Sequence, residues 1–200
     1  MPAMFNSQRG SVLLVSLVLL LIVTLLGTAA MQGATLESKM TSNSQARQQA
    51  FNSAEAALRQ AERFIDEGHI DDADLRDGCS GSYCFNSSCN GGFCFEGEFA
   101  AATPDNLCST VDTDPGVTPP TVGVWARTGL DVWSNAGRHR VVNLPDGMSG
   151  KYIVEFRCFT DSLSPPVPYG DIVYRITARG TSKSGQVEAM VQSTYRAARP

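Results

Sequence analysis

The sequence predicts an α+β fold: one long N-terminal helix packs on a C-terminal antiparallel β-sheet, with a cysteine-rich loop region between them. The first observation behind this prediction is an uncharged apolar run near the N-terminus. The second is a helical pattern that continues beyond the run without proline. The third is the alternation of apolar and polar residues in segments after residue 150. Because the apolar face of a sheet needs a covering layer, the amphipathic part of the helix is its expected partner.

The apolar run is long enough to cross a membrane. No charged residue occurs from 11 to 36, and thirteen of the fifteen residues at 12–26 are Leu, Ile or Val. About 20 apolar residues suffice for a spanning helix. The run is either a signal peptide cleaved near the small residues at 27–30 or a retained anchor. The helical pattern beyond residue 30 favours the anchor, and Arg9 before the run favours a cytoplasmic N-terminus.

An amphipathic helix is expected to follow the apolar run. Mostly apolar or small residues recur there at spacings of three, four and seven: Leu36, Met40, Arg47, Phe51, Ala54, Leu58, Ala61 and Ile65. Such spacing places them on one side of a helix. A single helix from 11 to 65 would be about 80 Å long at 1.5 Å per residue.

The six cysteines all follow the apolar run and are predicted to form disulfides. They are Cys79, Cys84, Cys89, Cys94, Cys108 and Cys158. An even number of cysteines on the exported side of a membrane is typical of disulfide-bonded proteins. Zinc sites instead use more closely spaced cysteines and usually histidines. Many pairings are open, of which the simplest joins Cys108 to Cys158. The quasi-repeat at 83–95 suggests a small hairpin with Cys89 near its turn.

The C-terminal part is predicted to be an antiparallel meander. Residues 151–159, 171–179 and 186–195 alternate between apolar and polar side chains, as expected of half-buried strands. The last two are joined by a six-residue turn at 180–185 and form a hairpin. The inward-facing residues are expected to be Tyr152, Val154, Phe156, Cys158, Ile172, Tyr174, Ile176, Ala178, Val187, Ala189, Val191 and Tyr195.

Composition and motifs argue against a nucleic-acid-binding protein and against an enzyme. The chain has 16 Lys and Arg against 20 Asp and Glu, a net charge of −4, whereas nucleic-acid-binding domains are usually strongly basic. Neither a nucleophile elbow nor a phosphate loop occurs, and the two histidines are isolated. No cofactor or metal is therefore expected. The acidic loops at 71–77 and 112–114 do not fit the EF-hand spacing; we expect them to be solvated, with a calcium site as the open alternative.

The two tryptophans, Trp125 and Trp133, admit two interpretations. They could form a pair on which a sugar ring stacks. The more common situation is that of aromatic side chains partly buried near a loop. The sequence favours the second interpretation.

Several motifs together resemble one family. The chain has a short leader ending in Arg9-Gly10, followed by SVLLVSLVLLLIVTLLGTAAMQGATLESKM at 11–40. AFNSAEAALRQAE follows at 50–62, YRITARGT at 174–181 and VQSTYR at 191–196. These segments resemble the type IV pilin class, and most closely its PilX family of minor pilins. The resemblance covers 8–65 and 171–196; none is seen over 66–150. It implies that a prepilin peptidase cleaves after Gly10 and that Ser11 becomes the methylated first residue.

One position departs from the pattern of the class that the chain resembles. Most pilins carry Glu at the fifth mature position, where the carboxylate balances the amine of a neighbouring subunit; here the residue is Val15. The departure implies a specialised place in the filament, at the tip or in an initiating complex. A type II secretion pseudopilin, or an anchored adhesion module that uses the cysteine-rich loop, remains an alternative.

The resemblance also implies an organisation and a location. We expect a leader at 1–10, a transmembrane and filament-core helix at 11–35, an amphipathic continuation at 36–66, a cysteine-rich region at 67–122 and the sheet at 123–200. The protein would lie in the inner membrane with its C-terminal part in the periplasm and then move to the pilus. Its partners would be other minor pilins, the major pilin, the prepilin peptidase and a PilY-type tip adhesin.

Overall fold

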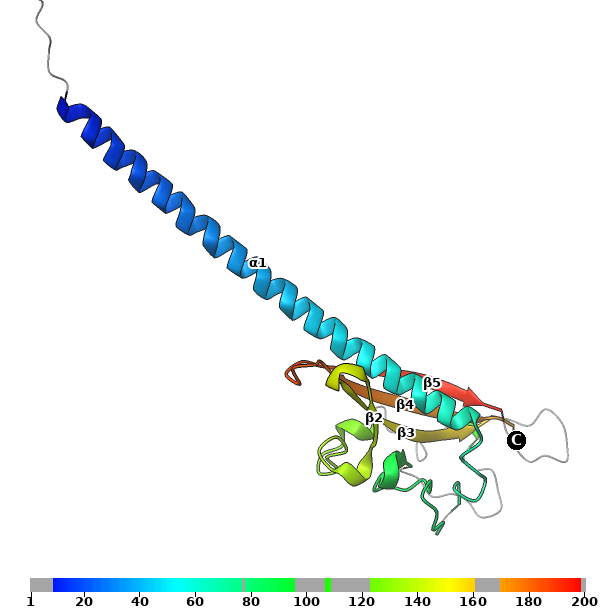
Figure 1. The fold of residues 1–200 in the computed structure, drawn as a ribbon. Helices are drawn as coiled ribbons and strands as arrows, with labels where there is room; N and C mark the ends of the chain where they lie inside the picture. The colour runs from blue at the N-terminus through cyan, green and yellow to red at the C-terminus, as the bar shows by residue number, and fades with distance from the viewer. Residues whose placement is uncertain (1–8, 77, 96–106, 109–122, 161–169, 199–200) are drawn as a thin grey trace, which may run out of the picture. The chain divides into compact units, whose positions relative to one another are not determined.

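The computed structural model describes residues 9–76, 78–95, 107–108, 123–160 and 170–198 (Figure 1). Contacts divide the chain into two units, Met1–Gln45 and Ala46–Pro200. Helix α1 (Arg9–Asp66) contributes to both units, and the sheet belongs to the second unit. The single helix predicted for 11–65 is thereby confirmed.

The first unit consists of helix α1 up to residue 45. Leucine-rich sequence without proline favours the helix, and the hydroxyl side chains at 12–36 bond within it. The hydroxyls of Ser16, Thr24, Thr28 and Thr35 each donate to the carbonyl three residues earlier, at 2.8–2.9 Å. Such internal bonds suit a helix that has no water around it.

The sheet of the second unit has strand order β1-β3-β4-β5, and β2 pairs with β3. Its long strands are β3 (Ser149–Phe159), β4 (Ile172–Thr181) and β5 (Glu188–Ala197), paired antiparallel. They confirm the predicted meander. Two short strands were not predicted: β1 (Phe93–Cys94), which runs parallel to β3, and β2 (Arg140–Asn143), which is antiparallel to β3.

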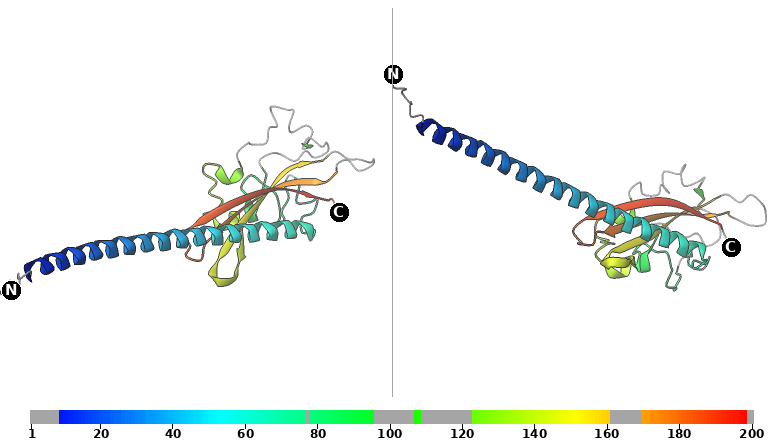
Figure 2. Two further views of the ribbon diagram at one scale, coloured as in Figure 1. Left: turned by 90° about the horizontal axis from the view of Figure 1, so that it is seen from above. Right: turned by 45° about the horizontal axis from the view of Figure 1, so that its top comes forward.

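Helix α1 covers one face of the meander from residue 50 onward (Figure 2). The buried helix residues are Ala50, Ser53, Ala54, Ala57, Leu58, Ala61, Phe64 and Ile65. They pack with inward-facing strand residues such as Tyr174, Ile176 and Ala178, as predicted. The predicted burial of the stripe was wrong in its N-terminal half, because Leu36, Met40 and Phe51 are exposed.

A pair of glycines brings the helix backbone close to the sheet. Gly150 and Gly180 face each other on β3 and β4. A Cβ on Gly180 would lie 2.1 Å from the backbone nitrogen of Ala54, and one on Gly150 would lie 2.7 Å from the carbonyl oxygen of Ser53. The Ser53 hydroxyl donates to the carbonyl of Thr181 at 3.0 Å. Only glycine allows this close approach.

The other face of β3 is buried too, which the alternation of its sequence did not predict. Ile153 and Glu155 are 0% and 2% exposed. A loop at 123–139 covers them and forms a second small core of Cys89, Cys94, Val124, Leu130, Val132 and Ile153. Glu155 accepts from Arg175 at 2.6 and 2.8 Å and from the backbone nitrogen of Val124 at 2.9 Å. The prediction of a half-buried β3 was therefore wrong, because a loop rather than solvent faces its polar residues.

Three disulfides tie down the cysteine-rich region. They join Cys79 to Cys84, Cys89 to Cys94, and Cys108 to Cys158. The predicted disulfides and the pairing of Cys108 with Cys158 are confirmed. The predicted hairpin at 83–95 was wrong: the only backbone pairing between its halves is an isolated parallel bridge between Asn86 and Cys94, and Cys94 pairs with β3.

We expect Gly180→Ala to destabilise the second unit by about 3 kcal/mol, because the added methyl group meets helix backbone that cannot move aside. Urea unfolding of the full chain in detergent measures the change. Gly137→Ala is the matched control: its Cβ would meet only the side chain of Asn135, at 3.4 Å, and its cost should stay within about 0.5 kcal/mol. Equal stability of the two variants would contradict the close approach.

We expect His139 to make folding stability depend on pH. His139 is 5% exposed, and its Nδ1 donates to the carbonyl of Val132 at 2.7 Å. Burial lowers the pKa of His139 below its usual 6.5. As pH falls through 6.5, the unfolded chain binds a proton before the folded chain does, so stability falls. Urea unfolding at pH 7.5 and 5.5 should show a smaller loss for His139→Asn than for the wild type.

The matched control for this experiment is His69→Asn, at the exposed second histidine. This variant should keep the wild-type fall in stability between the two pH values. A His139→Asn variant with an undiminished fall would show that the buried imidazole is not the titrating group.

Candidate assembly surface

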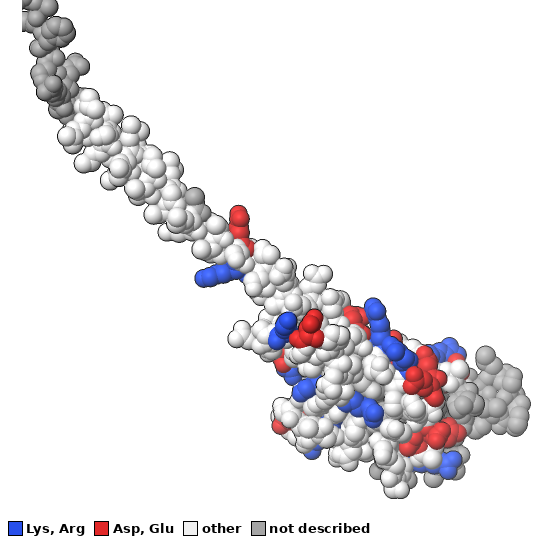
Figure 3. All heavy atoms as spheres, viewed as in Figure 1, with Lys and Arg blue, Asp and Glu red and all other residues white. Residues whose placement is uncertain are grey.

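The apolar half of α1 presents a continuous exposed surface. Every Leu, Ile and Val from 12 to 26 is between 45% and 71% exposed. Figure 3 shows a long stretch of α1 without charged side chains, as the uncharged run at 11–36 requires. Such a surface is unstable in water, so it must be covered by lipid or by other protein chains.

The length and hydropathy of this helix fit a membrane span. Within the described residues one helix qualifies, and its most apolar window has a mean hydropathy of 2.8 with none of its residues buried. A soluble core helix would be mostly buried. The N-terminal apolar helix is therefore suited to serve as a membrane anchor.

The residues singled out for processing lie at the beginning of this helix. Gly10 and Ser11 belong to the first turn of α1, immediately after Arg9. Val15 is 53% exposed and leaves the run without any carboxylate. Cleavage after Gly10 and methylation of Ser11 stay predictions.

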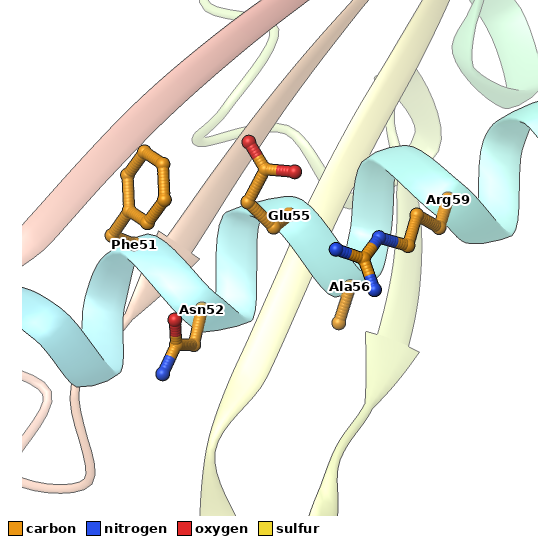
Figure 4. A pocket seen from close by; sticks show the side chains of 5 residues that line it. All are labelled: Phe51, Asn52, Glu55, Ala56 and Arg59. Atoms are coloured by element: carbon orange, nitrogen blue, oxygen red, sulfur yellow. The ribbon is translucent and has the colours of Figure 1, made fainter.

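A second surface lies on the second unit's part of α1, on the side away from the sheet. A shallow hollow there is lined by Phe51, Asn52, Glu55, Ala56 and Arg59 (Figure 4). Phe51 is a large apolar side chain, 49% exposed, beside the polar side chains of Asn52, Glu55 and Arg59. Sequence periodicity assigned Phe51 to the buried stripe. Its exposure depends on which side of the helix packs on the sheet, which periodicity does not determine.

The cysteine-rich region is packed against the end of α1 by aromatic rings. Phe64 of the helix contacts Tyr83 and Phe93, with ring centroids 5.2 and 5.8 Å apart. The Arg140 guanidinium lies over the ring of Phe64, 4.6 Å from its centroid. Cation–π contacts and disulfides together give this glycine-rich region a fixed structure.

The described residues contain no group of three or more His, Cys, Asp and Glu side chains that could hold a metal ion. Asp74 caps a turn by accepting from the backbone nitrogen of Asp71 at 3.0 Å. Asp77 and the acidic loop at 112–114 lie outside the described residues. Trp125 and Trp133, by contrast, line one common hollow.

Comparison with known proteins identifies the family. The model described as PilX N-terminal matches residues 9–59, and the model of the type IV pilus assembly protein PilX C-terminal part matches residues 82–197. The second match extends through the middle of the chain, where sequence motifs alone gave no resemblance. No curated protein and no solved structure matches the chain. The two family matches cover the apolar helix and the sheet, and the chain therefore belongs to the PilX family of type IV pilus assembly proteins.

Proposed function

We propose that this chain is a minor pilin that primes the assembly of the type IV pilus and occupies its tip. The observation that carries the proposal is the exposed, uncharged helix with Val15 at the fifth position after the leader. Membership of a pilus assembly family supports a structural rather than an enzymatic role. It also favours the pilus over a type II secretion system.

The physical argument starts from the missing carboxylate. An ionised carboxylate at the centre of a membrane helix costs about 2.5–3.5 kcal/mol on insertion scales. The pilins that this chain resembles accept that cost, and the carboxylate then balances a neighbouring subunit's amine. A subunit with valine at position 15 inserts more easily but leaves a neighbour's amine unbalanced. It therefore suits a position where one neighbour is absent.

The proposal also assigns a route to the chain. The prepilin peptidase cleaves after Gly10 on the cytoplasmic side, and Ser11 is then methylated. The second unit lies in the periplasm, where oxidising conditions let its three disulfides form. From the inner membrane the chain joins other minor pilins, the major pilin and a PilY-type tip adhesin.

Gly10→Leu should block processing, because a peptidase site beside the membrane leaves little room for a side chain at the cut. We expect full-length protein in the inner membrane and few surface pili, measured by intact-mass spectrometry and by counting pili. Gly33→Leu is the matched control, since nothing lies within 4 Å of a Cβ there. Normal cleavage of Gly10→Leu would refute the pilin route.

Immunogold labelling tests the tip position. Wild-type protein should label filament ends, be scarce in sheared shafts, and be required for nearly all surface pili. Val15→Glu supplies the missing carboxylate and should spread the label along the shaft. Val18→Glu, with the carboxylate one turn away, is the control and should stay at the ends. Uniform shaft labelling of the wild type would overturn the proposed position.

A further inference from the structure

The hollow on the sheet face opposite α1 has the side-chain composition of a sugar site. It is lined by Trp125, Trp133, Arg179, Glu188, Ala189 and Met190. The tryptophans come from the loop at 123–139, and the other four residues come from β4 and β5. We propose that this hollow, which we call the tryptophan groove, binds a neutral oligosaccharide. The inference goes beyond the proposed function and does not depend on it.

Both tryptophans pack against the small core of the second unit, and hydrogen bonds hold the backbone beside them. Trp125 follows Val124, whose backbone nitrogen donates to the buried carboxylate of Glu155 at 2.9 Å. Trp133 follows the buried Val132, and its own carbonyl accepts from Nζ of Lys151 at 3.0 Å. A groove fixed before the ligand arrives loses less entropy on binding.

Gly123 gives Trp125 its position. A Cβ on Gly123 would lie 2.4 Å from Cδ1 and from Nε1 of Trp125, so the indole lies directly over this glycine. The backbone angles of Gly123 are φ −59° and ψ 149°, which any residue adopts. An added methyl group would therefore displace the indole without straining the backbone.

The lining can contact both the C–H groups and the hydroxyl groups of a pyranose ring. The C–H groups on one face of such a ring are weakly positive, and the faces of indole rings carry negative charge density. The exposed thioether of Met190 extends the apolar floor. At the rim, the guanidinium of Arg179 pairs with the carboxylate of Glu188, which offers donors and acceptors to sugar hydroxyls.

Charge selects the class of ligand. Arg179 and Glu188 neutralise each other, so the described lining residues carry no net charge. An anionic ligand would meet the negative carboxylate of Glu188 beside the guanidinium, whereas a neutral ring with hydroxyl groups can bond to both partners. This composition favours a neutral oligosaccharide over an acidic one.

The chain provides its own probe for the test, because its only two tryptophans line this groove. The full chain, kept in a detergent without sugar groups, is titrated with maltotriose, cellotriose and triacetylchitotriose. Tryptophan emission is followed, with calorimetry as an independent measure. We expect a saturable change in emission, and heat of binding, with at least one of the three.

Variants locate the site. Gly123→Ala and Trp125→Ala should weaken binding by at least about tenfold, the loss of one aromatic stacking contact. Glu188→Ala, at an exposed rim position, should weaken it without affecting folding. Phe51→Ala removes an exposed aromatic ring from the other face and is the matched control, with unchanged binding.

Three results would overturn the proposal. One is the absence of saturable binding with all three trisaccharides at their solubility limit. Another is binding that persists unchanged in both Gly123→Ala and Glu188→Ala, which would place the site elsewhere. The third is saturation of the groove by a proline-rich peptide but by none of the sugars, which would assign the groove to a peptide.

Discussion

The close approach of the helix backbone to the β3–β4 glycine pair determines how the second unit is built. With Gly150 and Gly180 opposite each other, the small residues Ala54 and Ala57 of α1 rest directly on the strands. The C-terminal end of α1 also bonds to the neighbouring strand. On β5, the hydroxyl of Tyr195 donates to Asp66 at 2.5 Å, a bond that raises the pKa of Tyr195 to about 12. Because α1 covers only one face of the sheet, the opposite face is covered by loops.

On the opposite face, an ion pair and a disulfide, rather than a second helix, hold the covering loop in place. The loop at 123–139 contains no strand, and its regular structure consists of two three-residue 3-10 helices. It is held by the buried Glu155–Arg175 pair, and beside it Cys89–Cys94 fills the small core. A buried carboxylate is tolerated here because it has three bonds to nearby donors. Two differently stabilised layers thus enclose β3, which explains why both of its faces are dry.

Sequence reasoning succeeded where the signal is local and failed where it depends on distant partners. The apolar run, the helix and the strands β3, β4 and β5 follow from periodicity and composition that extend over nine residues or more. The two-residue β1 and the burial of Glu155 depend on a loop whose course no periodicity encodes. Phe51 fits a helical stripe by spacing, yet it lies outside because the helix contacts the sheet through alanines. Gly150 and Gly180 lie immediately outside the strands predicted at 151–159 and 171–179, so their place inside β3 and β4, and with it the close contact, was not predicted.

The same helix meets two different environments, and its charges follow that division. In the second unit, the α1 carboxylates of Glu62 and Asp66 accept hydrogen bonds from Ser193 and Tyr195 of β5. From 11 to 36 there is no charge to pair, so only dispersion and the exclusion of water hold this segment to its neighbours. In the proposed role, the two neighbours of this subunit are bound differently. The new amine of Ser11 can still be balanced by a neighbour's carboxylate, but Val15 offers none to the next subunit. A subunit that can form this ion pair through its amine on one side, and has no carboxylate for the pair on the other, makes a head-to-tail assembly end there, as a filament tip requires.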